Sequence, residues 1–196
     1  MTEYSPEPEA KDPPARRIHL IQGEFHVTAY ADVLLTTTLG SCVATCIRDP
    51  VARIGGMNHF LLPHGENFEG PNAQRYGAYA MELLINAMLR AGARRNRLEA
   101  KLFGGALLDE RLPDIGALNV EFAHAFLVHE KVAVKSVVSG GRHALRVQFW
   151  PVLGRVRHIH LADNEEAIFA AELHKRMVRP DLGSVELFET HGANRI

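Results

Sequence analysis

Between residues 18 and 62 the chain carries short runs of β-branched and other apolar residues, a pattern typical of β-strands. After a polar N-terminal stretch, runs rich in Val, Ile, Leu, Thr and Phe begin near residue 18. They predict strands at 19–21, 24–28, 33–39, 43–47 and 53–62. Between the last two runs, residues 49–52 carry Pro50 in their second position, which is typical of a type I turn. We therefore expect a β-hairpin with a tight turn at 49–52.

The rest of the chain mixes helical and strand periodicity. A polar loop at 63–74 precedes apolar residues at helical spacing, which predict a helix over 75–89. Later patterns predict strands at 98–103, 132–138, 145–150 and 156–161, and a second helix at 119–129. Asp163 followed by Glu166 has the spacing of a capping box, so a last helix should run to about residue 177.

Strand runs interleaved with only two or three helices favour an α+β fold over a doubly wound parallel sheet. We expect a layered sandwich of mostly antiparallel β-sheet. Residues 2–17 hold four prolines and almost no large apolar side chains, so 1–17 should form a flexible N-terminal arm. The main domain should span 18–162, and 163–196 should form a C-terminal helix and tail.

Composition narrows the class of protein. The chain has 196 residues, of which 46% are hydrophobic and 23% charged, as in a globular domain. A formal net charge of −1 gives no electrostatic reason to expect nucleic acid or an anionic membrane as a partner. No apolar run approaches the roughly 20 residues that span a bilayer, and the N-terminus lacks the pattern of a secretory signal. We therefore expect a cytoplasmic protein that does not insert into the membrane.

The chain has two cysteines, Cys42 and Cys46. On one strand they would lie about 13 Å apart, too far for a disulfide. Each of the two thiols is then a buried apolar group, a metal ligand or a nucleophile. His158 and His160 share a strand face but have no recognisable third ligand, and no phosphate-binding motif is present. We predict neither a metal site nor a cofactor, and we expect Cys46 to be part of the core.

A tight turn at 49–52 would place Cys42 directly opposite His59 across the hairpin. Side chains in that relation have Cβ atoms about 5 Å apart. An imidazole so close can take the thiol proton and give a thiolate–imidazolium pair. A slip of one residue at Gly55–Gly56 would instead turn His59 to the opposite face.

Several motifs occur in a fixed order along residues 20–160. They are Thr36 six residues before Cys42, Leu-Gly-Ser-Cys at 39–42, Gly-Gly-Met-Asn-His-Phe-Leu-Leu-Pro at 55–63, Arg-Tyr-Gly-Ala-Tyr-Ala-Met-Glu at 75–82 and Leu-Glu-Ala-Lys-Leu-Phe-Gly-Gly-Ala at 98–106. Together they resemble the CheD family of chemoreceptor glutamine deamidases.

The resemblance implies hydrolysis of selected chemoreceptor glutamines to glutamate, with release of ammonia. Cys42 would be the nucleophile that forms a thioester, His59 the general acid and base, and Thr36 the partner that orients the His59 ring. The family resemblance also implies a fold similar to the catalytic domain of cytotoxic necrotizing factor toxins. The implied partners are the cytoplasmic helices of chemoreceptors and a CheC-type phosphatase.

Five further residues are candidates for substrate or oxyanion binding, namely Gly40, Ser41, Asn58, Gly104 and Gly105. Each has a structural alternative. Ser41 and Asn58 could satisfy local backbone groups, and the Gly104–Gly105 pair could permit a tight turn or close packing. Because receptor glutamines lie on long helices, we expect a shallow, open site.

Three positions depart from the family pattern. Leu118 and Leu145 stand where arginine is usual, and Val138 stands where aspartate is expected. Lost charges there favour a second hypothesis, a catalytically weak or inactive binding module that regulates a CheC-type phosphatase or a receptor. A third hypothesis is a cysteine acyltransferase, in which an amine replaces water at the thioester.

Overall fold

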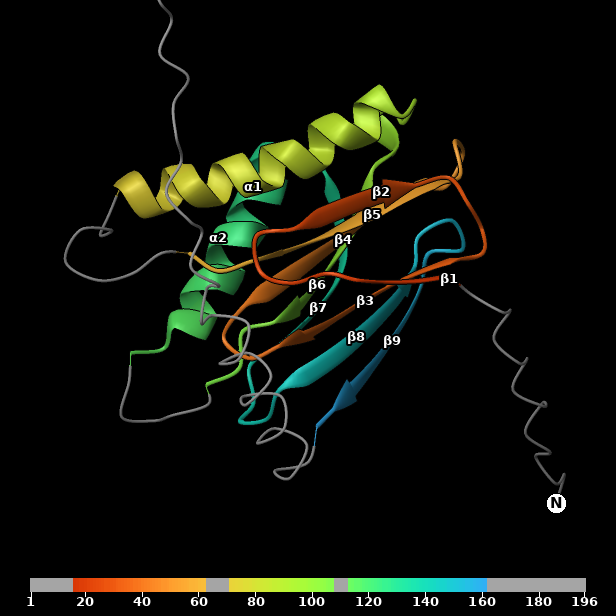
Figure 1. The fold of residues 1–196 in the computed structure, drawn as a ribbon. Coiled ribbons are helices and arrows are strands. Elements are labelled where there is room, and N and C mark those ends of the chain that lie inside the picture. The colour runs from red at the N-terminus through yellow and green to blue at the C-terminus, as the bar shows by residue number, and fades with distance from the viewer. Residues whose placement is uncertain (1–15, 63–70, 108–112, 162–196) are drawn as a thin grey trace, which may run out of the picture. The chain divides into compact units, whose positions relative to one another are not determined.

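The computed structural model describes residues 16–62, 71–107 and 113–161. Within these ranges, five strands come first along the chain, two longer helices flank the sixth strand, and three strands follow the second helix (Figure 1). The elements are β1 (Arg16–His19), β2 (Phe25–Thr28), β3 (Val33–Leu39), β4 (Val43–Asp49), β5 (Ile54–Phe60), α1 (Pro71–Arg90), a short 3₁₀ helix (Arg95–Arg97), β6 (Glu99–Gly104), α2 (Ile115–His129), β7 (Ala133–Ser139), β8 (Leu145–Trp150) and β9 (Arg155–His160).

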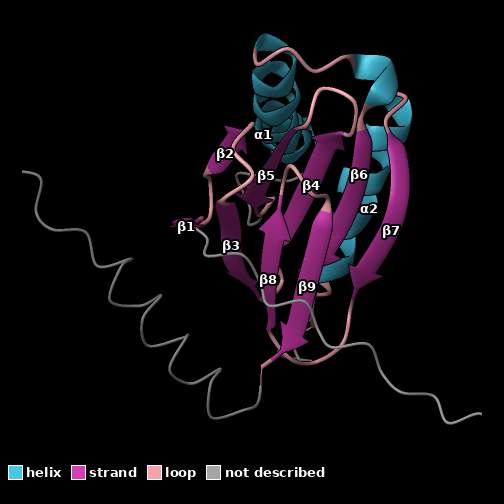
Figure 2. Cartoon of the chain, turned by 90° about the vertical axis from the view of Figure 1, so that its right-hand side faces the viewer, coloured by secondary structure: helices cyan, strands magenta, loops and turns pink. Residues whose placement is uncertain are grey.

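The strands form two sheets, ordered β1-β3-β8-β9 and β2-β5-β4-β6-β7. Within the described ranges, β1–β3 and β6–β7 are parallel pairs and the remaining pairs are antiparallel. Figure 2 shows β8 and β9 on one side of the five-stranded sheet and α2 on the other. The layers are thus sheet, sheet and helices, which confirms the expected α+β sandwich of mostly antiparallel strands.

Alternation along β4 builds a separate core on each face of the five-stranded sheet. Val43 and Ile47 face the helices and pack in one cluster with residues of α1 and α2. Ala44 and Cys46 point the other way, into a second cluster between the two sheets that also holds Met57 of β5. Cys46 is only 2% exposed, which confirms that it belongs to the core.

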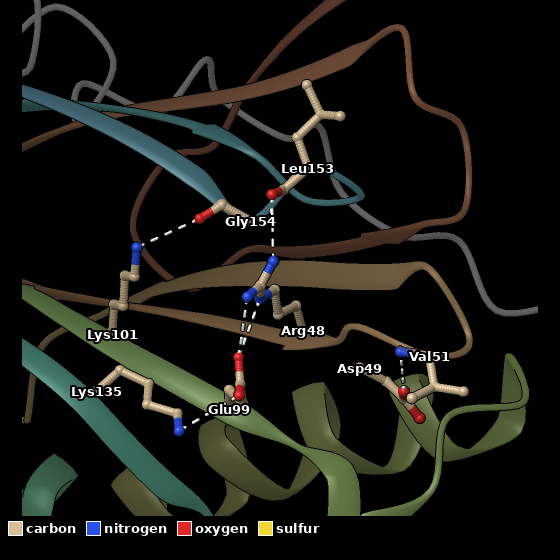
Figure 3. A network of polar contacts seen from close by, with 8 residues as sticks. All are labelled: Arg48, Asp49, Val51, Glu99, Lys101, Lys135, Leu153 and Gly154. Carbon is tan, nitrogen blue, oxygen red and sulfur yellow. Dashed lines mark hydrogen bonds and ion pairs between the residues drawn. The ribbon is translucent and has the colours of Figure 1, made fainter.

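The turn between β4 and β5 lies at 50–53, one residue later than predicted, because Asp49 pairs with Ile54. The Asp49 carboxylate accepts hydrogen bonds from the N–H groups of Val51 and Ala52, both at 2.9 Å. Figure 3 shows the bond from Val51. Arg53 closes the turn in the left-handed region, with φ 56°. This later turn shifts the hairpin register by two residues, so Ala44 stands opposite His59 and the expected pairing of Cys42 with His59 is wrong.

Polar side chains connect the two sheets near the C-terminal end of β4 (Figure 3). Arg48 pairs with Glu99 at 3.1 Å and donates to the Leu153 carbonyl at 3.2 Å. Lys101 donates to the Gly154 carbonyl at 3.3 Å. Since residues 153 and 154 belong to the β8–β9 turn, these bonds fix that turn against the five-stranded sheet.

Both helices begin four residues before their predicted starts. The first helical residue of α1 is Pro71. Proline suits this position because the first N–H groups of a helix have no intrahelical acceptor, so the N–H that proline lacks is not missed. In α2 the Asp114 side chain accepts a hydrogen bond from the Ala117 N–H at 2.8 Å and so caps the helix.

The other end of the domain also differs from expectation. Strand β1 begins at Arg16, inside the range predicted as an arm, because it pairs in parallel with β3. Residues 1–15 and the last predicted helix lie outside the described residues. In the described part of the chain, neither helix has the length and apolar character needed to cross a bilayer.

Candidate active site

The short turn at 40–42 holds Cys42 between β3 and β4, and the end of β6 fixes its backbone. The N–H groups of Gly105 and Ala106 donate to the carbonyls of Cys42 and Gly40, both at 2.9 Å. A Cβ on Gly104 would lie 2.2 Å from the Cys42 carbonyl oxygen, and Gly104 has φ +117°. The Gly104–Gly105 pair therefore serves the close packing considered as its structural alternative.

Asn119 of α2 is a second support for the same turn. This residue is fully buried. Its amide nitrogen donates to the Ser41 carbonyl at 3.0 Å, and its oxygen accepts from the Leu62 N–H at 2.7 Å. One side chain thus connects the residue before Cys42 with the chain that follows β5. The sequence pattern gave no reason to select Asn119 from the other polar residues of the helix.

His59 lies on β5, is 5% exposed, and points into the layer between the two sheets. Its Nδ1 atom is 2.8 Å from Thr37 Oγ1, and the Thr37 hydroxyl also lies 2.8 Å from the Leu20 carbonyl oxygen. That carbonyl can only accept, so the Thr37 hydroxyl donates to Leu20 and its oxygen accepts from Nδ1–H. This network assigns the proton of the neutral ring to Nδ1 and leaves the lone pair on Nε2.

The hydrogen bond expected from Thr36 is therefore made by its neighbour. Leu35 and Leu39 face the inter-sheet core, and strand alternation sends Thr37 to the same side. Thr36 points the opposite way, with its hydroxyl oxygen 3.2 Å from Nδ1 of His19. The structure thus brings Thr37, and not Thr36, to the buried imidazole.

Cys42 and His59 nevertheless share one face of the sheet. Strand β4 begins at Val43, which pairs with Phe60, the residue after His59. Cys42 immediately precedes this pair and packs against the inter-sheet cluster, the side to which His59 also points. The Cys42 thiol donates instead to Gln22 Oε1 at 3.8 Å, and His59 Nε2 is buried without a hydrogen-bond partner in the described structure.

Burial sets the charge state of both groups. It raises the pKa of the Cys42 thiol to about 12 and lowers the pKa of the His59 imidazole to about 4. Burial therefore favours the neutral thiol and the neutral imidazole over the thiolate–imidazolium pair expected from the sequence.

Asn58 lies on the opposite face of β5 from His59. It is 2% exposed, its Oδ1 accepts from the Thr45 N–H at 3.0 Å, and its Nδ2 donates to the Ala80 carbonyl at 3.3 Å. These bonds join β4, β5 and α1. The structure thus does not bring the Asn58 side chain to Cys42.

The three departures from the family pattern have different surroundings. Leu145 is 4% exposed and pairs with Leu39, so it is a core residue. Val138 is half-buried and packs against the inter-sheet cluster. Leu118 is 57% exposed on α2, which makes it a surface residue.

The structure thus belongs to a class of layered α+β proteins that hold a cysteine thiol and a buried, unpaired imidazole nitrogen on one sheet face. Sequence comparison makes the assignment specific. The family model described as CheD chemotactic sensory transduction matches residues 61–159. The chain belongs to the CheD family.

Two relatives show how far the similarity extends. A protein of Caulobacter sp. (strain K31), named probable chemoreceptor glutamine deamidase CheD, is 51% identical over 177 residues, which cover 89% of this chain and 94% of that protein. The protein of the same name in Acidiphilium cryptum (strain JF-5) is 52% identical over 179 residues, with the same shares. A solved structure, the hypothetical protein YfiH of Bacillus licheniformis, has 14% identity and a TM-score of 0.40, covers 68% of this chain and 63% of its own, and is too distant to add to the fold.

Proposed function

We propose that this protein deamidates selected glutamine side chains on the cytoplasmic helices of chemoreceptors, giving glutamate and ammonia. The names of its relatives support this substrate. The observation that carries the chemistry is the buried, unpaired Nε2 of His59 on the sheet face that also bears Cys42. A base without a partner beside a thiol fits nucleophilic catalysis.

The first half of the reaction forms a thioester. As Cys42 Sγ bonds to the glutamine carboxamide carbon, its proton passes to His59 Nε2, so the thiolate exists only during attack. In this proposal the backbone N–H of Cys42, which also lowers the pKa of its own thiol, stabilises the oxyanion. The imidazolium then protonates the amide nitrogen, the C–N bond breaks and ammonia leaves.

The second half consumes water. His59 Nε2 takes a proton from a water molecule as its oxygen attacks the thioester carbon. The C–S bond breaks, the sulfur regains a proton from the imidazolium, and glutamate is released. Thr37 and the Leu20 carbonyl keep the ring in one tautomer through both halves.

Incubation with a receptor cytoplasmic fragment tests this function. Ammonia release should accompany the conversion of discrete receptor glutamines to glutamate, read by mass spectrometry. Cys42→Ala should lower the rate at least about a thousandfold while the fold is retained. Cys46→Ala is the matched control, since it removes the core cysteine and should leave turnover intact. A Cys42→Ala protein that deamidates normally disproves the nucleophile.

The same assay separates the other hypotheses. An inactive binding module would bind the receptor fragment without releasing ammonia, equally well with and without the Cys42 thiol. An acyltransferase would leave an added amine on the receptor instead of a new carboxylate. The family resemblance also leads us to propose a CheC-type phosphatase as a partner, which co-elution of the two purified proteins would test.

A further inference from the structure

The chain between β1 and β2 makes a tight turn over the site. The Glu24 N–H donates to the Ile21 carbonyl at 3.1 Å, and Gly23 has φ +89°. A positive φ at the third residue defines a type II turn, in which glycine is favoured. Gln22 occupies the second position, at the exposed tip of this turn.

Both sides of the turn are fastened to the strands that carry the site. On the N-terminal side, the Leu20 carbonyl accepts from the Thr37 hydroxyl at 2.8 Å. On the C-terminal side, the Gly23 N–H donates to the His59 carbonyl at 2.8 Å, and the His59 N–H donates to the Glu24 carbonyl at 3.0 Å. Gln22 is therefore held between two anchored residues, directly beside the catalytic candidates.

The side chain at this position ends in a primary carboxamide, the same group as the proposed substrate. Its Oε1 accepts the hydrogen bond from the Cys42 thiol at 3.8 Å. Building on the deamidase function, we propose that Gln22 is an internal competitor of the substrate. Its carboxamide occupies the place beside the nucleophile that the receptor glutamine must take.

The geometry explains why this contact blocks the site and does not lead to reaction. The thiol contacts the amide oxygen, whereas attack requires the sulfur to approach the amide carbon. The thiol also remains protonated, because burial raises its pKa to about 12. A substrate displaces Gln22 by breaking one weak hydrogen bond and rotating an exposed side chain, so the competition is modest.

Alkylation of Cys42 by iodoacetamide tests the contact without any receptor. In the full-length protein, peptide mass mapping distinguishes Cys42 from Cys46. Gln22→Ala and Gln22→Asn, which is one methylene shorter, should both be alkylated about three- to tenfold faster than wild type. Gln22→Glu keeps the length and an acceptor oxygen, and its negative charge disfavours a thiolate, so it should react no faster than wild type. Ile21→Ala, in the same turn, should react at the wild-type rate.

The receptor assay then tests competition. Gln22→Ala should raise kcat/KM for the receptor fragment by about the same three- to tenfold factor, through a lower KM and an unchanged kcat. Unchanged alkylation of Gln22→Ala overturns the contact, whatever the receptor assay gives. An active Gln22→Ala with unchanged or lower kcat/KM overturns the competitor role and leaves the deamidase function standing. Faster alkylation with no deamidation by any variant overturns the function itself, and the competitor role with it.

Discussion

At the scale of single residues, two adjacent threonines differ in what they can do. Thr36 and Thr37 have the same chemistry, but strand alternation turns only Thr37 toward the buried His59 ring. The Thr37 hydroxyl donates its hydrogen to the Leu20 carbonyl, so its oxygen accepts from His59 Nδ1–H. This arrangement fixes the tautomer of the base. The family resemblance implied Thr36 through its position six residues before Cys42, and that position lies on the opposite face of the strand from the His59 ring.

Replacing each threonine by valine, which has similar size but no hydroxyl, separates the two. Thr37→Val should lower kcat on the receptor fragment about 10- to 100-fold with little change in KM, because the ring loses the partner that orients it. Thr36→Val should stay within about twofold of wild type, since its hydroxyl contacts His19. Steady-state kinetics on both variants is the measurement.

A spectroscopic control distinguishes orientation from general damage. Nitrogen NMR of the imidazole should show the His59 proton on Nδ1 in wild type and in Thr36→Val, and a mixture of tautomers in Thr37→Val. A larger loss of kcat in Thr36→Val than in Thr37→Val would contradict this assignment and restore Thr36 as the partner of the base.

At the scale of elements, the β4–β5 hairpin shows what sequence could and could not predict. The strands and the shared face of Cys42 and His59 followed from alternation, and the actual register differs from the predicted one by an even number of residues. The turn position could not be predicted, because it depends on Asp49. That buried carboxylate also accepts from the Arg94 N–H and the Arg97 guanidinium, both at 2.9 Å, and these groups come from a distant part of the chain.

Other residues that contact the Cys42 turn could not be predicted either, because they too come from distant parts of the chain. Asn119 and Gln22 reach the Cys42 turn from segments far from it in sequence. Only the folded sheets bring these segments together. Thr37, by contrast, could have been predicted from the sequence. It alternates with Leu35 and Leu39 on the buried face of its strand, whereas Thr36 lies on the other face and is less buried.

The approach of β6 to the Cys42 turn leads to a prediction about this element. In Gly104→Ala the new methyl group would meet the Cys42 carbonyl oxygen at 2.2 Å, in a backbone conformation that alanine rarely adopts. We expect the free energy of unfolding to fall by about 2–4 kcal/mol and the deamidation rate to fall with it, because the turn that carries the nucleophile must move. Urea unfolding and the receptor assay measure the two effects.

Gly141→Ala is the matched control. Gly141 also has a positive φ, +83°, but nothing lies within 4 Å of its added Cβ. This variant should lose about 1 kcal/mol from backbone strain alone and keep wild-type activity. If Gly104→Ala retained full activity, the close packing of β6 would not be needed to position Cys42.

At the scale of the whole molecule, the site is assembled across the interior. His59 belongs to the five-stranded sheet, Thr37 belongs to the four-stranded sheet that packs against it, and Cys42 lies in the turn that connects the two. The imidazole therefore lies in the layer that holds the two sheets together. A change in its charge should affect the stability of the entire fold as well as catalysis.

Acid should reveal this coupling. Burial lowers the pKa of His59 from its ordinary 6.5 to about 4, so between these pH values the unfolded chain binds a proton that the folded protein does not. Stability then rises with pH across this window and is lost as pH falls from 6.5 toward 4, by at most about 3 kcal/mol. Urea unfolding at pH 7.0 and pH 4.5 measures the loss.

His59→Gln is the control variant. Its side chain cannot titrate, so its unfolding free energy should change less between the two pH values. The carboxylate of Asp49, whose pKa is lowered by its hydrogen bonds, loses its contribution only below its ordinary value of 3.8 and so stays charged in both measurements. An equal loss in wild type and His59→Gln would show that the buried ring is not the group that couples pH to folding.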